Sequence, residues 1–112
     1  MVEPQNGVAE VGTVYTVHYA LNGVMHTERL SNEAEYDALL LRLMALAREG
    51  YEVEISGGNA AQTLSMSKEV VTYTTKKESE AIAWSKQKID EGYNVYVTYD
   101  QETGIYTCIA YR

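Results

Sequence analysis

Two histidines and one cysteine are the side chains of this sequence best suited to metal binding or nucleophilic catalysis. His18 and His26 flank Asn22-Gly23, a dipeptide typical of a two-residue β-hairpin turn. That turn pairs Tyr19 with His26, and it puts the two histidines on opposite faces because strand side chains alternate between faces. We therefore expect no shared zinc site, and no motif in the sequence indicates a cofactor.

Cys108 is the single cysteine, so an intramolecular disulfide cannot form. A nucleophilic cysteine needs a neighbouring base, and no motif around Cys108 supplies one. We interpret it as a small, semi-buried strand residue, as free cysteines often are.

Acidic pairs such as Glu52 with Glu54, and Glu33 with Asp37, could bind calcium or act in acid-base catalysis. None has the spacing of a calcium-binding loop. Negative charge near a helix N-terminus is favourable in its own right, which accounts for Glu33 and Asp37. Gly57-Gly58 lacks the Lys-Ser/Thr of a phosphate-binding loop. The sequence predicts no catalytic residue, and we expect the protein not to be an enzyme.

Aromatic composition gives the strongest hint of a binding surface, with ten tyrosines and no phenylalanine. Tyr96, Thr98 and Tyr106 are predicted to share the face of a sheet that no helix covers. Tyrosine is favoured at recognition surfaces because it offers contact area at low entropic cost. In the alternative interpretation, cross-strand tyrosine pairs simply stabilise the hairpin.

The segment from Thr74 to Arg112 positions these tyrosines. Thr75 and Glu78 have the spacing of a capping box and predict a helix that ends at Gly92. A strand from Tyr93 to Tyr99, a loop over 100–104 and a second strand should follow. If Tyr99 pairs with Ile105, the most apolar residues of both strands share one side of the sheet, and we expect the helices to cover that side. The opposite side then carries Tyr96, Thr98, Tyr106, Cys108 and Ala110.

Earlier in the chain, alternating side chains predict strands over 11–21, 24–30 and 51–56, and strand character with a bulge over 62–75. Asn32 and Glu35 predict the start of a first helix that runs to about Arg48 and ends before Gly50. Its apolar stripe is Tyr36, Leu39, Leu40, Leu43, Leu46 and Ala47, with Leu41 and Met44 on the flank. Leu41, and Trp84 at the boundary of the second helix's stripe, are candidate interface residues.

An internal repeat appears when Glu49-Gly50-Tyr51-Glu52-Val53 is laid on Glu91-Gly92-Tyr93-Asn94-Val95, 42 residues later. At this offset Thr63–Lys68 corresponds to Ile105–Ala110. The copies, about 24–68 and 69–112, indicate a duplicated strand-helix-strand-strand unit. We predict an α+β fold, a two-layer sandwich of order ββαββαββ with about six antiparallel strands and two helices on one face.

Length and charge narrow the classes of partner. A chain of 112 residues suits one domain, here 11–112, after a flexible N-terminal leader over 1–10. The net charge of −7 disfavours nucleic acid. No apolar run approaches the roughly 18 residues of a transmembrane segment.

The strand and helix texture from Lys68-Glu69-Val70-Val71 through Tyr106-Thr107-Cys108, with the repeated Glu-Gly-Tyr, loosely resembles small uncharacterised domains of exported Bacteroidetes proteins. The resemblance covers most of the chain after Val11. It implies a domain of unknown function that is exported, to the periplasm or cell surface, if an export signal precedes Met1 in the natural protein. It implies no functional residue.

Three hypotheses of function remain open, and one of them is a purely structural spacer within a larger exported protein. The first is a non-catalytic binding or accessory domain that uses Tyr96, Thr98 and Tyr106, with a homodimer as one form of association. The alternative is a small enzyme or ligand carrier, with a pocket between the first helix and the sheet lined by Tyr19, His26 and Glu28.

Overall fold

Six antiparallel strands and two helices make up the computed structural model, which describes residues 15–57 and 68–112. The strands are β2 (Tyr15–Leu21), β3 (Val24–Leu30), β4 (Val53–Ser56), β5 (Val70–Thr75), β6 (Asn94–Asp100) and β7 (Ile105–Tyr111). The helices are α1 (Glu33–Arg48) and α2 (Glu78–Asp90). The strands form one sheet of order β3-β2-β4-β6-β7-β5. The α+β class and the order ββαββαββ are confirmed. The predicted leader lies outside the described residues.

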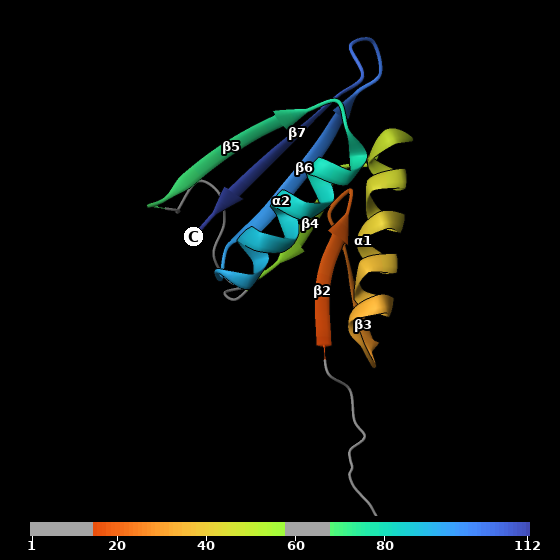
Figure 1. Cartoon of the computed structure of the whole chain (residues 1–112), viewed down its shortest axis with the longest axis vertical. Coiled ribbons are helices and arrows are strands. Elements are labelled where there is room, and N and C mark those ends of the chain that lie inside the picture. The colour runs from red at the N-terminus through yellow and green to blue at the C-terminus, as the bar shows by residue number, and fades with distance from the viewer. Residues whose placement is uncertain (1–14, 58–67) are drawn as a thin grey trace, which may run out of the picture.

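Both helices pack on the same face of the sheet, which we call the helix-covered face (Figure 1). The core between the layers contains Leu39, Leu40, Leu43 and Met44 of α1, all at most 1% exposed. Val53, Ile55, Val95 and Val97 meet them from the sheet and are fully buried. Burying an aliphatic side chain of this size stabilises a fold by about 1.5–3 kcal/mol, so this layer of the molecule is the main source of stability.

The start of α1 follows the sequence prediction closely. Asn32 caps the helix, because its side chain accepts a hydrogen bond from the Glu35 backbone N–H at 2.9 Å. The Glu35 carboxylate in turn accepts from the Ser31 backbone N–H. Gly50, with a φ of 107°, ends the helix. This end requires a left-handed backbone, which glycine adopts without strain.

The start of α2 differs from the prediction. The helix begins at Glu78 rather than after Thr75, and its N-cap Lys77 makes no side-chain capping bond. The Thr75 hydroxyl instead accepts from the Lys77 backbone N–H and donates to Glu80. Thr75 is the last residue of β5. The carboxylate that its hydroxyl contacts is Glu80, two residues beyond the Glu78 of the predicted capping box.

The register of the last hairpin is also different. Asp100 pairs with Ile105, so Tyr99 faces Tyr106 and Val97 faces Cys108, one residue away from the predicted pairing. The Asp100 side chain accepts from the Glu102 N–H at 2.9 Å, and its carbonyl accepts from the Gly104 N–H at 2.8 Å. These bonds, with a φ of 74° at Gly104, shorten the turn to four residues. Tyr106, Cys108 and Ala110 therefore lie on the helix-covered face, and the prediction that placed them on the opposite face was wrong.

The two segments that the predicted repeat aligns are neighbours at the centre of the sheet. β4 and β6 pair antiparallel with Glu54 opposite Tyr96, the residue that the offset of 42 assigns to it. The strands that precede the helices, β3 and β5, occupy the two edges. One strand lies between each edge strand and the central pair, β2 on one side and β7 on the other. β2 comes before its edge strand β3 in the chain, whereas β7 comes after the central strand β6. Most of the predicted strand Thr63–Lys68 lies outside the described residues.

Neither described helix has the length and hydrophobicity needed to cross a membrane.

Candidate functional site

The face of the sheet opposite the helices, here called the open face, carries the sequence-predicted residues Tyr96 and Thr98. Tyr96 stands in a cross-strand row with Glu54 of β4 on one side and Ile109 of β7 on the other. Tyr96, Glu54 and Ile109 are half-buried. The centre of the open face therefore combines an aromatic ring, a carboxylate and an aliphatic side chain, none fully withdrawn from solvent.

Threonines form the neighbouring row. Thr98 of β6 is directly opposite Thr107 of β7, which is directly opposite Thr74 of β5. Thr72, on the same side of β5, pairs with Ile109. The β-branched side chain of threonine is restricted at χ1, so these hydroxyls are held in a narrow set of orientations across three strands.

Two carboxylates affect the Tyr96 hydroxyl. Burial raises the pKa of Tyr96, and the charges of Glu52 and Glu54 raise it further. Burial alone raises the pKa of Glu54. A pair of neighbouring groups that are both partly desolvated costs free energy in the isolated protein, and such groups are more frequent where a protein binds something.

One end of the open face is buried. Tyr111 at the end of β7 is only 1% exposed, and Asn94, its cross-strand partner on β6, is 4% exposed. The Asn94 side chain accepts a hydrogen bond from the Gly57 backbone N–H at 2.9 Å. The accessible region is therefore centred on Tyr96 and Thr98.

Tyr106, the third predicted site residue, does not belong to this region. It is 2% exposed on the helix-covered face, and its ring lies 4.8 Å from that of Tyr99. Its hydroxyl accepts from Arg48 at 3.3 Å and donates to Glu78 at 3.5 Å. Tyr106 therefore ties the end of α1 to the start of α2, and its role is structural.

Cys108 is also buried under α2, where Ala81 and Ser85 are fully buried with it. Burial raises the pKa of the Cys108 thiol to about 11, although the Ser85 hydroxyl opposes the shift. At neutral pH the thiol is protonated and shielded from solvent, which does not suit a nucleophile. The small side chains of Ala81, Ser85 and Cys108 allow α2 to lie close to β7.

The two predicted interface residues occupy different places. Leu41 is 50% exposed on the outer side of α1. Trp84, on α2, is half-buried and stacks on Tyr73 of β5 with ring centroids 5.4 Å apart. Trp84 is thus a boundary residue, as its helical position indicates, and lies beside an edge strand.

Tyr19, His26 and Glu28, the proposed pocket lining, do come together. The rings of Tyr19 and His26 stack at 5.3 Å, and the Tyr19 hydroxyl donates to Glu28 at 2.5 Å. Arg42 of α1 forms an ion pair with the same carboxylate. These contacts give the Tyr19 hydroxyl and the Glu28 carboxylate partners from within the protein, while His26 contributes ring stacking. His18 points to the opposite face and contacts Thr27 at 2.9 Å.

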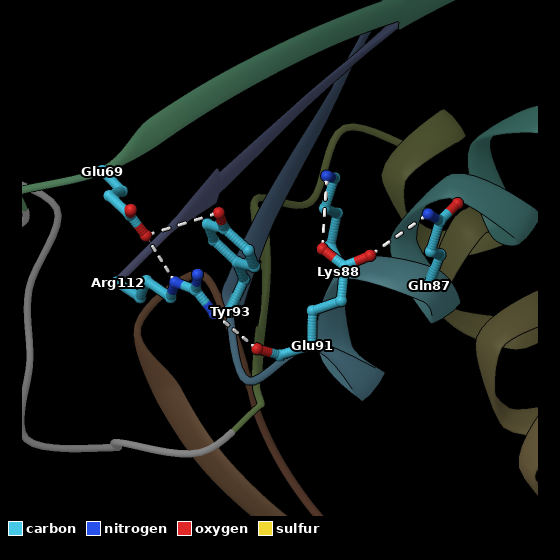
Figure 2. A network of polar contacts seen from close by, with 6 residues as sticks. All are labelled: Glu69, Gln87, Lys88, Glu91, Tyr93 and Arg112. Atoms are coloured by element: carbon cyan, nitrogen blue, oxygen red, sulfur yellow. Dashed lines mark hydrogen bonds and ion pairs between the residues drawn. The ribbon is translucent and has the colours of Figure 1, made fainter.

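A polar network joins the C-terminus to the end of α2 (Figure 2). Arg112 lies 4.1 Å from the centre of the Tyr93 ring and pairs with Glu69 at 2.5 Å. It also donates to the Glu91 carbonyl at 2.6 Å, and Lys88 pairs with the Glu91 carboxylate. The acids and bases of this network are matched, so we interpret it as a brace between β5, β7 and α2.

The sequence analysis missed Glu54, Thr107 and Ile109 as members of the open face. The repeat contained a signal for Glu54, since it aligns this residue with Tyr96. The correct hairpin register would have added Thr107 and Ile109.

The fold defines a two-layer α+β protein in which neither described helix covers the second face of the sheet. No protein-family model, curated protein or solved structure matches this chain.

Proposed function

We propose that this protein is a non-catalytic binding domain whose open face docks onto a protein partner. The observation that carries the proposal is Tyr96, half-buried on the open face, which neither described helix covers, with Thr98 on the same face. Tyr96 supplies aromatic area, and the row Thr98, Thr107 and Thr74 supplies hydroxyls that both donate and accept.

A sheet surface of this composition favours a macromolecule over a small ligand. Small molecules are typically bound in concave sites that bury most of their surface. Protein interfaces are flatter, and their energetic centres are enriched in tyrosine. Strand side chains are already ordered by the sheet, so association costs less conformational entropy than it would with a loop.

Replacing Tyr96 by Ser should weaken binding of the partner at least about tenfold, as truncation of a central aromatic residue usually does. The free energy of unfolding should change by no more than about 1 kcal/mol, because Tyr96 is half-exposed and outside the core. The measurement is affinity capture by the immobilised wild-type domain and by the variant, followed by titration of the captured protein. Thermal unfolding of both domains accompanies it.

Leu41→Ser is the matched control, because Leu41 is exposed on the helix layer. A partner retained by the wild type and by Leu41→Ser, but lost by Tyr96→Ser, supports the open face. A partner retained equally by all three proteins contradicts it.

A further inference from the structure

The outer edge of β5 is the second surface with unusual properties. β5 is the last strand of the sheet (Figure 1), and no strand among the described residues pairs with its outer side. Val70 is 52% exposed and Val71 is 37% exposed. The strand from Val70 to Thr75 contains no charged residue and no proline, although proteins normally use these residues to protect an edge from pairing.

The pairing with β7 determines which backbone groups of β5 face outward. Glu69 and Arg112 exchange both backbone hydrogen bonds, N–H to C=O in each direction, at 3.1 Å. In an antiparallel ladder the bonded pairs alternate, so the odd-numbered residues of β5 direct their groups at β7. Val70, Thr72 and Thr74 therefore present their N–H and C=O groups to the free edge.

This alternation restricts how a second copy of β5 could pair with the first. Directly opposite residues in an antiparallel pair either both exchange backbone bonds or both do not. An even-numbered residue must then face an even-numbered residue, and the same sheet faces continue from one copy into the other. The helices of both copies would lie on one side, and the two-fold axis would be perpendicular to the sheet.

Charge distinguishes two neighbouring registers, one centred on Tyr73 and one centred on Thr72. With Tyr73 opposite Tyr73 of the second copy, the count of residues brings Glu69 to the level of Lys77, which follows the end of β5 and the bend at Lys76 and has an extended backbone at φ −102° and ψ 122°. Both contacts of the Glu69 carboxylate use Oε1, which leaves Oε2 for that lysine. Shifting the centre to Thr72 would set Lys68 against Lys76, and like charges directly opposite are unfavourable.

Aromatic packing fits the same register. Tyr73 at the two-fold axis stacks on its own Trp84 at 5.4 Å. Two copies would bring two such pairs together over the joined sheet and would cover Val71 on the same face. Thr72 and Thr74 would exchange main-chain bonds across the axis.

We propose that a second copy of this chain is the partner of the β5 edge, forming a two-fold dimer centred on Tyr73 with Glu69 opposite Lys77. The dimer joins the two sheets edge to edge and leaves both open faces uncovered. It is independent of the proposed open-face binding, because Tyr96 takes no part in it.

Light scattering and sedimentation of the full chain over a micromolar concentration range test this proposal. The wild type should have twice the monomer mass at high concentration. Thr72→Pro should be monomeric, because it removes an outward N–H without removing a bond to β7, and proline is tolerated at such edge positions. Thr72→Ala keeps the N–H and should still dimerise.

Two further variants keep the test decisive if Thr72→Pro does not fold. Lys77→Glu should weaken dimerisation by about tenfold, since it creates two repulsive pairs with Glu69. Tyr73→Cys should form a disulfide-linked dimer under mild oxidation, because non-bonded antiparallel pairs bring Cα atoms within disulfide range. Thr72→Cys should not.

A wild type that is monomeric throughout the concentration range would overturn the proposal. A dimer that survives both Thr72→Pro and Lys77→Glu would also overturn it, since association would then use another surface. Cross-linking through Thr72→Cys in preference to Tyr73→Cys would reject the register and the pairing of Glu69 with Lys77.

Discussion

Replacing Tyr106 by Ala should lower the free energy of unfolding by about 3–5 kcal/mol, the usual cost of truncating a buried aromatic residue. The side chain is 2% exposed and packs on Tyr99. Its loss also removes the hydroxyl that lies between Arg48 and Glu78. Chemical denaturation monitored by circular dichroism measures the effect. For a domain of this size we expect the melting temperature to fall by more than about 10 °C.

Tyr106→Phe separates packing from hydrogen bonding. The ring stays, so the loss should be only about 1 kcal/mol, as expected for one hydrogen-bonding group. Tyr96→Ser provides the comparison on the other face. Equal stability losses for Tyr106→Ala and Tyr96→Ser would contradict the hairpin register that places these tyrosines on opposite faces.

Gly57→Ala should destabilise the protein by about 3 kcal/mol or more, because the added methyl group has no space to occupy. A Cβ at this position would lie 1.7 Å from the Tyr93 carbonyl oxygen and 3.2 Å from the Ile89 Cα. Both atoms belong to the main chain, so no side-chain rotation can relieve the contact. The backbone would have to shift, which would disturb the bond from the Gly57 N–H to Asn94.

Gly23→Ala is the matched control for this change. Gly23 has a φ of 84°, and no atom lies within 4 Å of its added Cβ. The substitution should therefore cost only the conformational strain, about 1 kcal/mol. If denaturant unfolding gives the same loss for both variants, the close approach of Gly57 to the start of β6 is wrong.

Local signals in the sequence were sufficient for most of the fold. Asn22-Gly23 fixes its turn chemically, and the predicted pairs Leu21 with Val24 and Tyr19 with His26 are confirmed. The glycine stops at Gly50 and Gly92 are confirmed as well. The predicted stripe of α1 is buried except at Leu46, which is half-buried, whereas Met44 from its flank is fully buried. In each case residues that are close together in the chain determine the local structure, so the sequence alone is enough to predict it.

The last hairpin could not be read in this way. In β7, Ile105, Thr107 and Ile109 look as apolar as Tyr106, Cys108 and Ala110, so alternation does not identify the buried face. Two physical facts decide it. Asp100 closes a four-residue turn with its side chain, and α2 approaches β7 through Ala81 and Ser85, which favours small residues opposite. The second fact depends on tertiary packing and is absent from the hairpin's own sequence.

This register changes the candidate site. Tyr96 and Thr98 remain on the open face, Tyr106 leaves it, and Thr107 and Ile109 replace Tyr106. The resulting surface is less aromatic and richer in hydroxyls than the sequence analysis indicates. Its centre contains the cross-strand pair Glu54 and Tyr96, which are 42 residues apart in the sequence.

Hydroxyl-radical footprinting of the domain with its captured partner tests most directly whether the open face is the binding surface. Oxidation read by mass spectrometry should fall at Tyr96 and Ile109 when the partner is bound, and Leu41 should be oxidised equally in the free and bound domain. Protection confined to Leu41 and the rest of the helix layer, with Tyr96 unchanged, would contradict the proposed function.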